Sequence, residues 1–66
     1  PYTAEVAKIH AEIRAKLKKD GSALSFADSQ IAAIAISNNM ILSTRNTKDF
    51  IQIAKYFPLM LENWWQ

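Results

Sequence analysis

The sequence contains no cysteine, one glycine and two prolines among its 66 residues. Without cysteine, neither a disulfide nor a thiolate metal site can stabilise the small core. The longest apolar runs are far shorter than the roughly 20 residues that cross a bilayer. No basic segment leads into an apolar stretch as in a signal peptide. We therefore expect a cytoplasmic protein.

Several common catalytic patterns are also missing. The sequence has no glycine-rich phosphate loop, no Ser/His/Asp arrangement and no paired Cys/His spacing. His10 has no second His or Cys near it, so we expect a surface or half-buried histidine and not a metal ligand. The net charge of +2 is too small to indicate nucleic-acid binding by itself.

The length permits one small domain, which buries only about 60% of its unfolded surface. The first residue is Pro1 and not Met, so we expect a fragment or a trimmed chain. Thr3 and Gly21 are predicted to begin and end an amphipathic helix over residues 3–19. Its apolar stripe at helical spacing comprises Val6, Ile9, Ile13 and Leu17.

A second helix is predicted to begin at Ser25, where Ser25 and Asp28 resemble a capping box with a shorter acid. Residues 31–36 are apolar on nearly every face, which predicts a buried helix. Asn38 and Asn39 are predicted to end it, because Asn tolerates the left-handed conformation.

Residues 40–44 form a short apolar run that predicts a buried parallel strand, and residues 59–62 predict a final short strand. A short helix over 48–56 would make the crossover between them. The predicted order is helix, helix, strand, helix, strand, which indicates an α/β fold. Because an isolated strand pair is marginal in water, we also expect partner strands that this chain does not contain.

Two carboxylates stand apart from the solvated or turn acids. Asp28 and Asp49 each lie in the first turn of a predicted helix, and Asp49 closely follows a strand. Ligands of open parallel sheets bind at the carboxyl ends of strands, so the two acids could share a cleft and hold Mg²⁺. The spacing equally fits two helix-capping residues, and it leaves both interpretations open.

Longer motifs resemble a known family. Residues 24–35 (LSFADSQIAAIA) are similar to the "ADxxIAAxA" helix of PIN-domain proteins of the VapC toxin group. Residues 41–50 (ILSTRNTKDF) resemble their "LxTRNxxDF" strand and turn. Residues 61–64 resemble the closing "LxNPW"-like strand, with Trp64 where a proline is common. The helix before Gly21 also looks like its counterpart in the family.

This resemblance implies that residues 1–66 are the C-terminal half of a PIN-like α/β/α sandwich. Family members are Mg²⁺- or Mn²⁺-dependent endoribonuclease toxins that are paired with an antitoxin. Asp28 would then be a catalytic metal ligand, and either Asn46 or Asp49 would fill a further acidic position. The same resemblance implies that the metal or the RNA phosphate lies near Thr44, Arg45 and Asn46.

The chain departs from the family in lacking the first-strand acid and the early glutamate, so we expect it to be inactive alone. We also expect it to associate with another copy or with the missing N-terminal half, because unpaired strand edges invite association. An alternative is a non-catalytic interaction module that forms a dimer or binds an antitoxin. A third hypothesis is a small basic DNA-binding protein. Its candidate contacts are Arg14, Lys16, Lys18 and Lys19.

Overall fold

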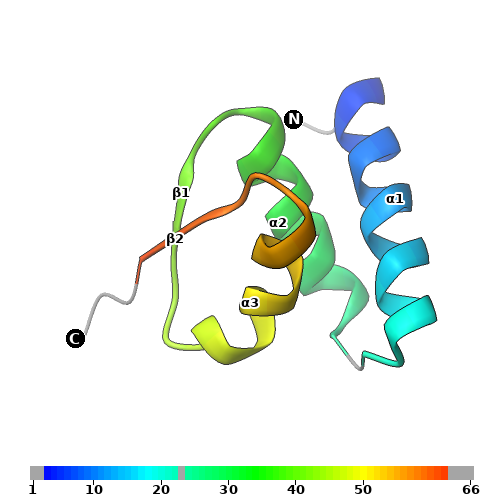
Figure 1. Ribbon diagram of the computed structural model, residues 1–66. Helices are drawn as coiled ribbons and strands as arrows, with labels where there is room; N and C mark the ends of the chain where they lie inside the picture. Colours follow the sequence, from blue (N-terminus) through cyan, green and yellow to red (C-terminus); the bar gives the residue numbers. More distant parts are fainter. Residues whose placement is uncertain (1–2, 23, 63–66) are drawn as a thin grey trace.

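The computed structural model describes residues 3–22 and 24–62 of the chain. The elements follow the predicted order and confirm a mixed α/β composition, and their ends differ from the predicted ends by single residues. Figure 1 shows them as α1 (Ala4–Asp20), α2 (Phe26–Ser37), β1 (Ile41–Ser43), α3 (Thr47–Tyr56) and β2 (Met60–Glu62). Asn63 and Trp64, which belong to the segment that resembles the closing strand of the PIN-domain family, lie outside the described residues.

Local hydrogen bonds set the two ends of α1. Thr3 Oγ1 accepts a hydrogen bond from the Val6 backbone N–H at 3.2 Å, which satisfies one donor of the first turn. Gly21 adopts a left-handed conformation with φ 73°, where glycine carries no steric penalty. Its N–H donates to the Lys18 carbonyl, and the Ser22 N–H donates to Leu17. These bonds close the helix as the sequence predicts.

The face that α2 turns toward α1 is built from small side chains. Ala32 and Ala33 are fully buried there, and Ser29 is buried between the helices. Small residues allow the two helix backbones to approach closely. On another side of the helix, Ile31 is 46% exposed. The prediction that α2 is buried on nearly every face is therefore wrong for this side, because no described element packs over it.

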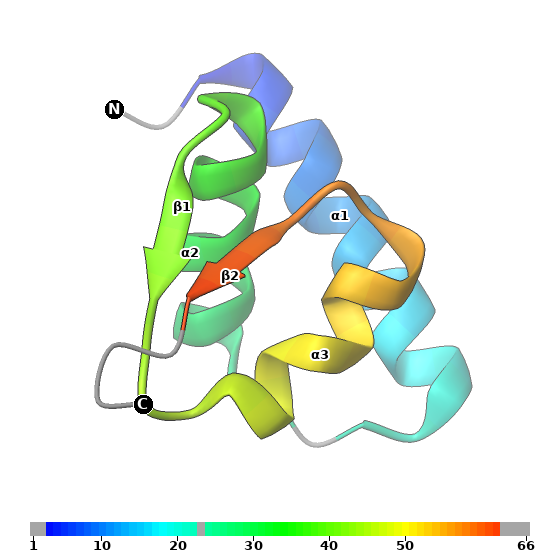
Figure 2. The same cartoon turned by 60° about the vertical axis from the view of Figure 1, so that its left-hand side comes forward.

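The strands β1 and β2 are parallel and form a two-stranded sheet, in the register Ile41↔Met60, Leu42↔Leu61 and Ser43↔Glu62. Figure 2 shows α2 behind β1, α3 beside β2, and α1 farther back. The side chains of Leu42 and Leu61 are half-buried, whereas Ile41 and Met60 are exposed.

The predicted burial of β1 is therefore wrong. A parallel strand is buried on both faces only where a layer covers each face. Within residues 3–22 and 24–62, the helices cover one face and nothing covers the other. The described residues form a sheet of two strands, and the expectation that further strands complete it stays a prediction. The full α/β/α sandwich would need a second helical layer.

The core lies where the three helices meet. Val6 and Ile13 of α1 pack there with Ile53 of α3, and all three side chains are at most 1% exposed. Phe50 and Leu59 extend this cluster toward the sheet. No helix in the described part of the chain is long and apolar enough to span a membrane.

Candidate functional site

A cleft of about 440 Å³ opens at the end of the molecule where the strands finish and α2 and α3 begin. Its wall includes both Asp28 and Asp49, which are far apart in the chain. The α1–α2 loop forms another part of its wall. The lining residues are Ser22, Leu24, Ser25, Asp28, Lys48, Asp49 and Gln52.

Asp28 occupies the third position of α2, and its side chain is half-buried. Its backbone N–H donates to Ser25 Oγ at 3.1 Å, which confirms the predicted cap. The donor of this bond is the backbone N–H of Asp28, so the bond does not involve the Asp28 carboxylate. The positive end of the helix dipole also favours a carboxylate at this position. Capping and ligand binding are therefore compatible roles for this residue.

Asp49 occupies the equivalent third position of α3 and is exposed. Its Oδ2 accepts a hydrogen bond from Asn46 Nδ2 at 2.7 Å. The N-cap residue Asn46 makes no side-chain hydrogen bond to the helix backbone. Its amide instead orients the Asp49 carboxylate beside the cleft. Asn46 contacts the site through Asp49 and does not line the cleft itself.

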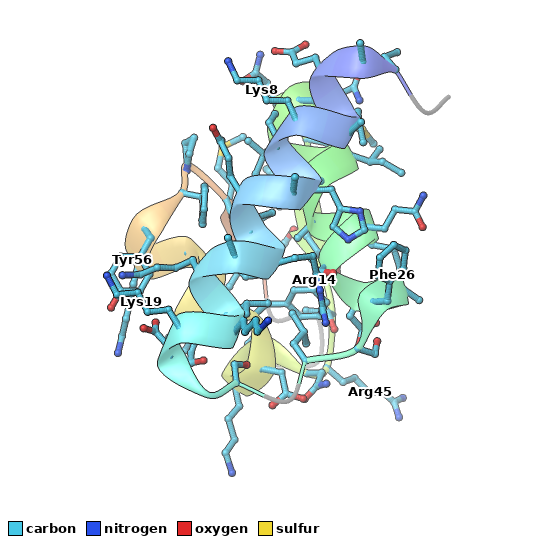
Figure 3. The ribbon with its side chains drawn as sticks, turned by 90° about the vertical axis from the view of Figure 1, so that its right-hand side faces the viewer. Lys8, Arg14, Lys19, Phe26, Arg45 and Tyr56 are labelled. Atoms are coloured by element: carbon cyan, nitrogen blue, oxygen red, sulfur yellow. The ribbon has the colours of Figure 1, made fainter. Side chains whose placement is uncertain are left out.

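The other predicted substrate contacts also lie beside the cleft. Thr44 is half-buried, and its Oγ1 accepts a hydrogen bond from the Asn46 backbone N–H at 2.9 Å. This bond shapes the turn from β1 into α3. Arg45 in the same turn is exposed, and Figure 3 shows it at this end of the molecule. Neither residue lines the cleft.

Sequence reasoning missed Lys48, which lines the same cleft as Asp28 and Asp49. It also missed Ser22 and Gln52, which add a hydroxyl and an amide. Lys48 precedes Asp49 in the first turn of α3. This position beside a candidate ligand is the one feature of the sequence that could have identified Lys48 as a cleft residue. Ser22 joins the cleft only because the α1–α2 loop folds back over this end.

The chemistry of the cleft is compatible with a small divalent cation. Mg²⁺ takes oxygen ligands and commonly binds only one or two carboxylates, with water or phosphate completing its shell. Asp28 and Asp49 supply two carboxylates. The described residues contain no group of three His, Cys, Asp or Glu side chains placed to hold a metal. A site of the three- or four-acid kind is therefore incomplete in this part of the chain.

A buried polar network lies behind the cleft, between α1 and α2. His10 is 3% exposed, which corrects the prediction of a surface or half-buried histidine. Its Nε2 lies 2.8 Å from Ser29 Oγ, and Ser29 Oγ donates to the Phe26 carbonyl at 2.9 Å. Arg14 Nη1 donates to the Leu24 carbonyl at 2.9 Å and to Ser29 Oγ at 3.3 Å. The network thus ties α1 to the segment that enters α2.

Stability should fall as the pH drops below about 6.5, the ordinary pKa of histidine. Burial lowers the pKa of His10, and the nearby Arg14 guanidinium lowers it further. A hydrogen bond to the Phe26 backbone opposes this shift. Below pH 6.5, His10 therefore binds a proton more readily in the unfolded chain than in the folded chain. The free energy of unfolding decreases as the pH falls through this range.

Urea unfolding at pH 7.5 and 5.5 measures this dependence. One proton accounts for at most about 1.4 kcal/mol per pH unit. The variant His10→Gln should show a weaker pH dependence in this window, even though it is less stable overall. Equal pH dependence in both proteins would show that His10 is not its source.

The basic residues of α1 are partly engaged inside the molecule. The Lys16 Nζ lies 4.0 Å from Asp20 Oδ1 and 4.0 Å from the centroid of the Tyr56 ring. Arg14 points toward α2, and its guanidinium carbon lies 5.7 Å from the centre of the Phe26 ring (Figure 3). Two of the four proposed DNA contacts therefore make internal contacts, which weakens the DNA-binding hypothesis.

No family model, curated protein or solved structure matches this chain.

Proposed function

We propose that the chain is the C-terminal part of a PIN-like, metal-dependent endoribonuclease of the toxin type, which cleaves RNA phosphodiester bonds. The observation that carries the proposal is the shared cleft of Asp28 and Asp49. Both acids occupy the third position of a helix at the end of the molecule where parallel strands finish. This is the usual location of ligands in open α/β sheets.

Asp28 and Asp49 would together hold Mg²⁺ or Mn²⁺ in this proposal. A bound ion of this kind activates water and stabilises the charge of the leaving oxygen. The hydrogen bond from Asn46 orients the Asp49 carboxylate. The Lys48 ammonium attracts an RNA phosphate into the cleft. Arg45, in the neighbouring turn, extends the positive charge along the path of the RNA.

The cleft is incomplete as an active site, and the uncovered sheet supports the same conclusion. Two carboxylates from two helices leave much of the coordination shell to water, and the other acids would come from further strands and helices. The exposed face of β1 and β2 is a place where such elements could pack. An antitoxin would block the cleft in the complete toxin.

The purified 66-residue chain is expected to cleave RNA negligibly, because it holds only part of the metal site. Incubation with a mixed RNA substrate in Mg²⁺ or Mn²⁺, followed by gel analysis, measures this. Ribonuclease contamination is controlled with a preparation of Asp28→Ala made in parallel. Metal-dependent cleavage by the wild-type chain that disappears in Asp28→Ala would contradict the expected inactivity.

A second candidate function is a non-catalytic interaction module. The observation that favours it is the exposed apolar surface around Ile31, Met40 and Ile41. Adding a separately produced N-terminal half of a PIN-like domain distinguishes the two candidates. Restored metal-dependent cleavage supports the ribonuclease, whereas binding without cleavage supports the interaction module.

A further inference from the structure

The wall of the cleft that carries Asp28 begins in a loop whose main chain is held by side chains. Leu24 and Ser25 line the cleft and precede the first residue of α2. The Leu24 N–H donates to Ser22 Oγ at 3.3 Å, and the Leu24 carbonyl accepts a hydrogen bond from Arg14 Nη1 at 2.9 Å. Both main-chain polar groups of Leu24 are therefore bonded to side chains and not to a helix or a strand. The position of this wall depends on those side chains.

Arg14 contacts the wall segment both before and after Asp28. Its Nη1 donates to the Leu24 carbonyl and also to Ser29 Oγ, at 2.9 and 3.3 Å. Its guanidinium carbon lies 5.7 Å from the centre of the Phe26 ring (Figure 3). One side chain thus makes three contacts along the segment, and they bracket Asp28 in the sequence. Arg14 therefore fixes this segment relative to α1.

Ser29 gives Arg14 a fixed partner on α2. Its side chain is fully buried, and its Oγ donates to the Phe26 carbonyl at 2.9 Å. A hydroxyl has one hydrogen to donate and two lone pairs that accept. The two lone pairs are left for Arg14 and for His10 Nε2, which lies 2.8 Å away. Loss of Arg14 would leave a lone pair of this buried hydroxyl and the Leu24 carbonyl unpaired, which is unfavourable.

We propose that Arg14 is a positioning residue for the cation site of the cleft. It holds the loop before α2 against α1, and Ser25 in this loop caps the helical turn that carries Asp28. Arg14 does not line the cleft, so it acts on Asp28 through the main chain. This inference rests on the proposed function, because it requires that Asp28 and Asp49 bind a divalent cation.

The charge of Arg14 gives the test a distinctive sign. A positive charge near a cation site weakens the binding of the cation. If Arg14 influenced the cleft by its charge alone, Arg14→Gln would strengthen the binding of Mn²⁺. If Arg14 positions the wall, the same substitution weakens binding, because Asp28 is no longer held in place beside Asp49. The direction of the change therefore separates the two effects.

Titration of the isotope-labelled chain with Mn²⁺ measures this affinity, because the paramagnetic ion broadens the amide signals close to it. In the wild type, the broadening should centre on Asp28 and Asp49. Arg14→Gln should raise the dissociation constant about tenfold, the lower end of the loss that follows removal of groups that orient metal ligands. Lys18→Gln is the matched control for charge, since Lys18 is exposed and does not line the cleft. Its dissociation constant should be unchanged or slightly lower.

Hydrogen exchange of the Asp28 amide tests the same contacts without a metal. This N–H donates to Ser25 Oγ, so its exchange rate reports on the cap. After correction for the global stability of each variant, Arg14→Gln should exchange this amide faster than Ile9→Ala. Ile9 is the matched control for lost stability, because it packs against the core and does not line the cleft.

Arg14→Lys provides the test if Arg14→Gln does not fold. Lysine keeps the charge and can donate to the Leu24 carbonyl, but it lacks the planar guanidinium that lies over Phe26. Its affinity for Mn²⁺ should fall below that of the wild type while the net charge stays the same. Where both variants fold, the affinity of Arg14→Lys should lie between those of the wild type and Arg14→Gln.

Unchanged or stronger Mn²⁺ binding in the Arg14 variants would overturn the proposal. A wild-type chain that binds no Mn²⁺ in the cleft would instead overturn the metal site of the proposed function. In that case the exchange of the Asp28 amide decides the role of Arg14. Faster exchange than in Ile9→Ala would show that Arg14 positions the wall, and equal exchange would show that it does not.

Discussion

Asp28→Asn is expected to lower metal-dependent RNA cleavage about a thousandfold in an enzyme completed with the N-terminal half. A metal ion provides several kcal/mol of transition-state stabilisation, and each 1.36 kcal/mol corresponds to about a factor of ten in rate. Asparagine keeps the shape of the side chain but removes the charge that holds the ion. Initial cleavage rates on one RNA substrate, measured across Mg²⁺ concentrations, give the effect.

The substitution leaves the helix cap in place, because the hydrogen bond to Ser25 comes from the Asp28 backbone N–H. Lost activity with an unchanged circular dichroism spectrum would therefore indicate a loss at the site. Asp20→Asn is the matched control, since Asp20 is exposed at the end of α1 and does not line the cleft. Similar rates for wild type and Asp28→Asn would refute the role of Asp28 as a metal ligand.

Ile13→Ala is expected to destabilise the protein by about 2–5 kcal/mol. Ile13 is fully buried in the core beneath α1, so its removal leaves a cavity in addition to the lost apolar burial. Folded domains have a total stability of only about 5–15 kcal/mol, and one this small lies at the lower end. The variant should therefore lose a large share of its stability and unfold at a much lower urea concentration than the wild type.

Urea unfolding followed by circular dichroism, at one fixed protein concentration, measures this loss. Ile51→Ala is the matched control, because Ile51 is 48% exposed on the surface of α3. It should change the free energy of unfolding by less than about 1 kcal/mol. Equal destabilisation by both variants would show that the α1 interface is not the main source of stability.

The sequence alone determined where α1 and α2 begin and end. Thr3 and Ser25 cap helices through hydrogen bonds to residues three positions later. Gly21 and Asn39 take positive φ values of 73° and 55° at helix ends, as their residue types allow. These interactions are local, so the residues that make them are visible in the sequence. The first-turn positions of Asp28 and Asp49 follow from the same local rules.

Only the tertiary structure decided how distant segments combine. His10 is buried because Ser29, 19 residues later, meets it across the α1–α2 interface. Lys48 faces the same cleft as Asp28 because α3 crosses back beside the start of α2. Ile41 is exposed because no described element covers the open face of the sheet. Such contacts join residues far apart in the chain, and no local pattern encodes which of them meet.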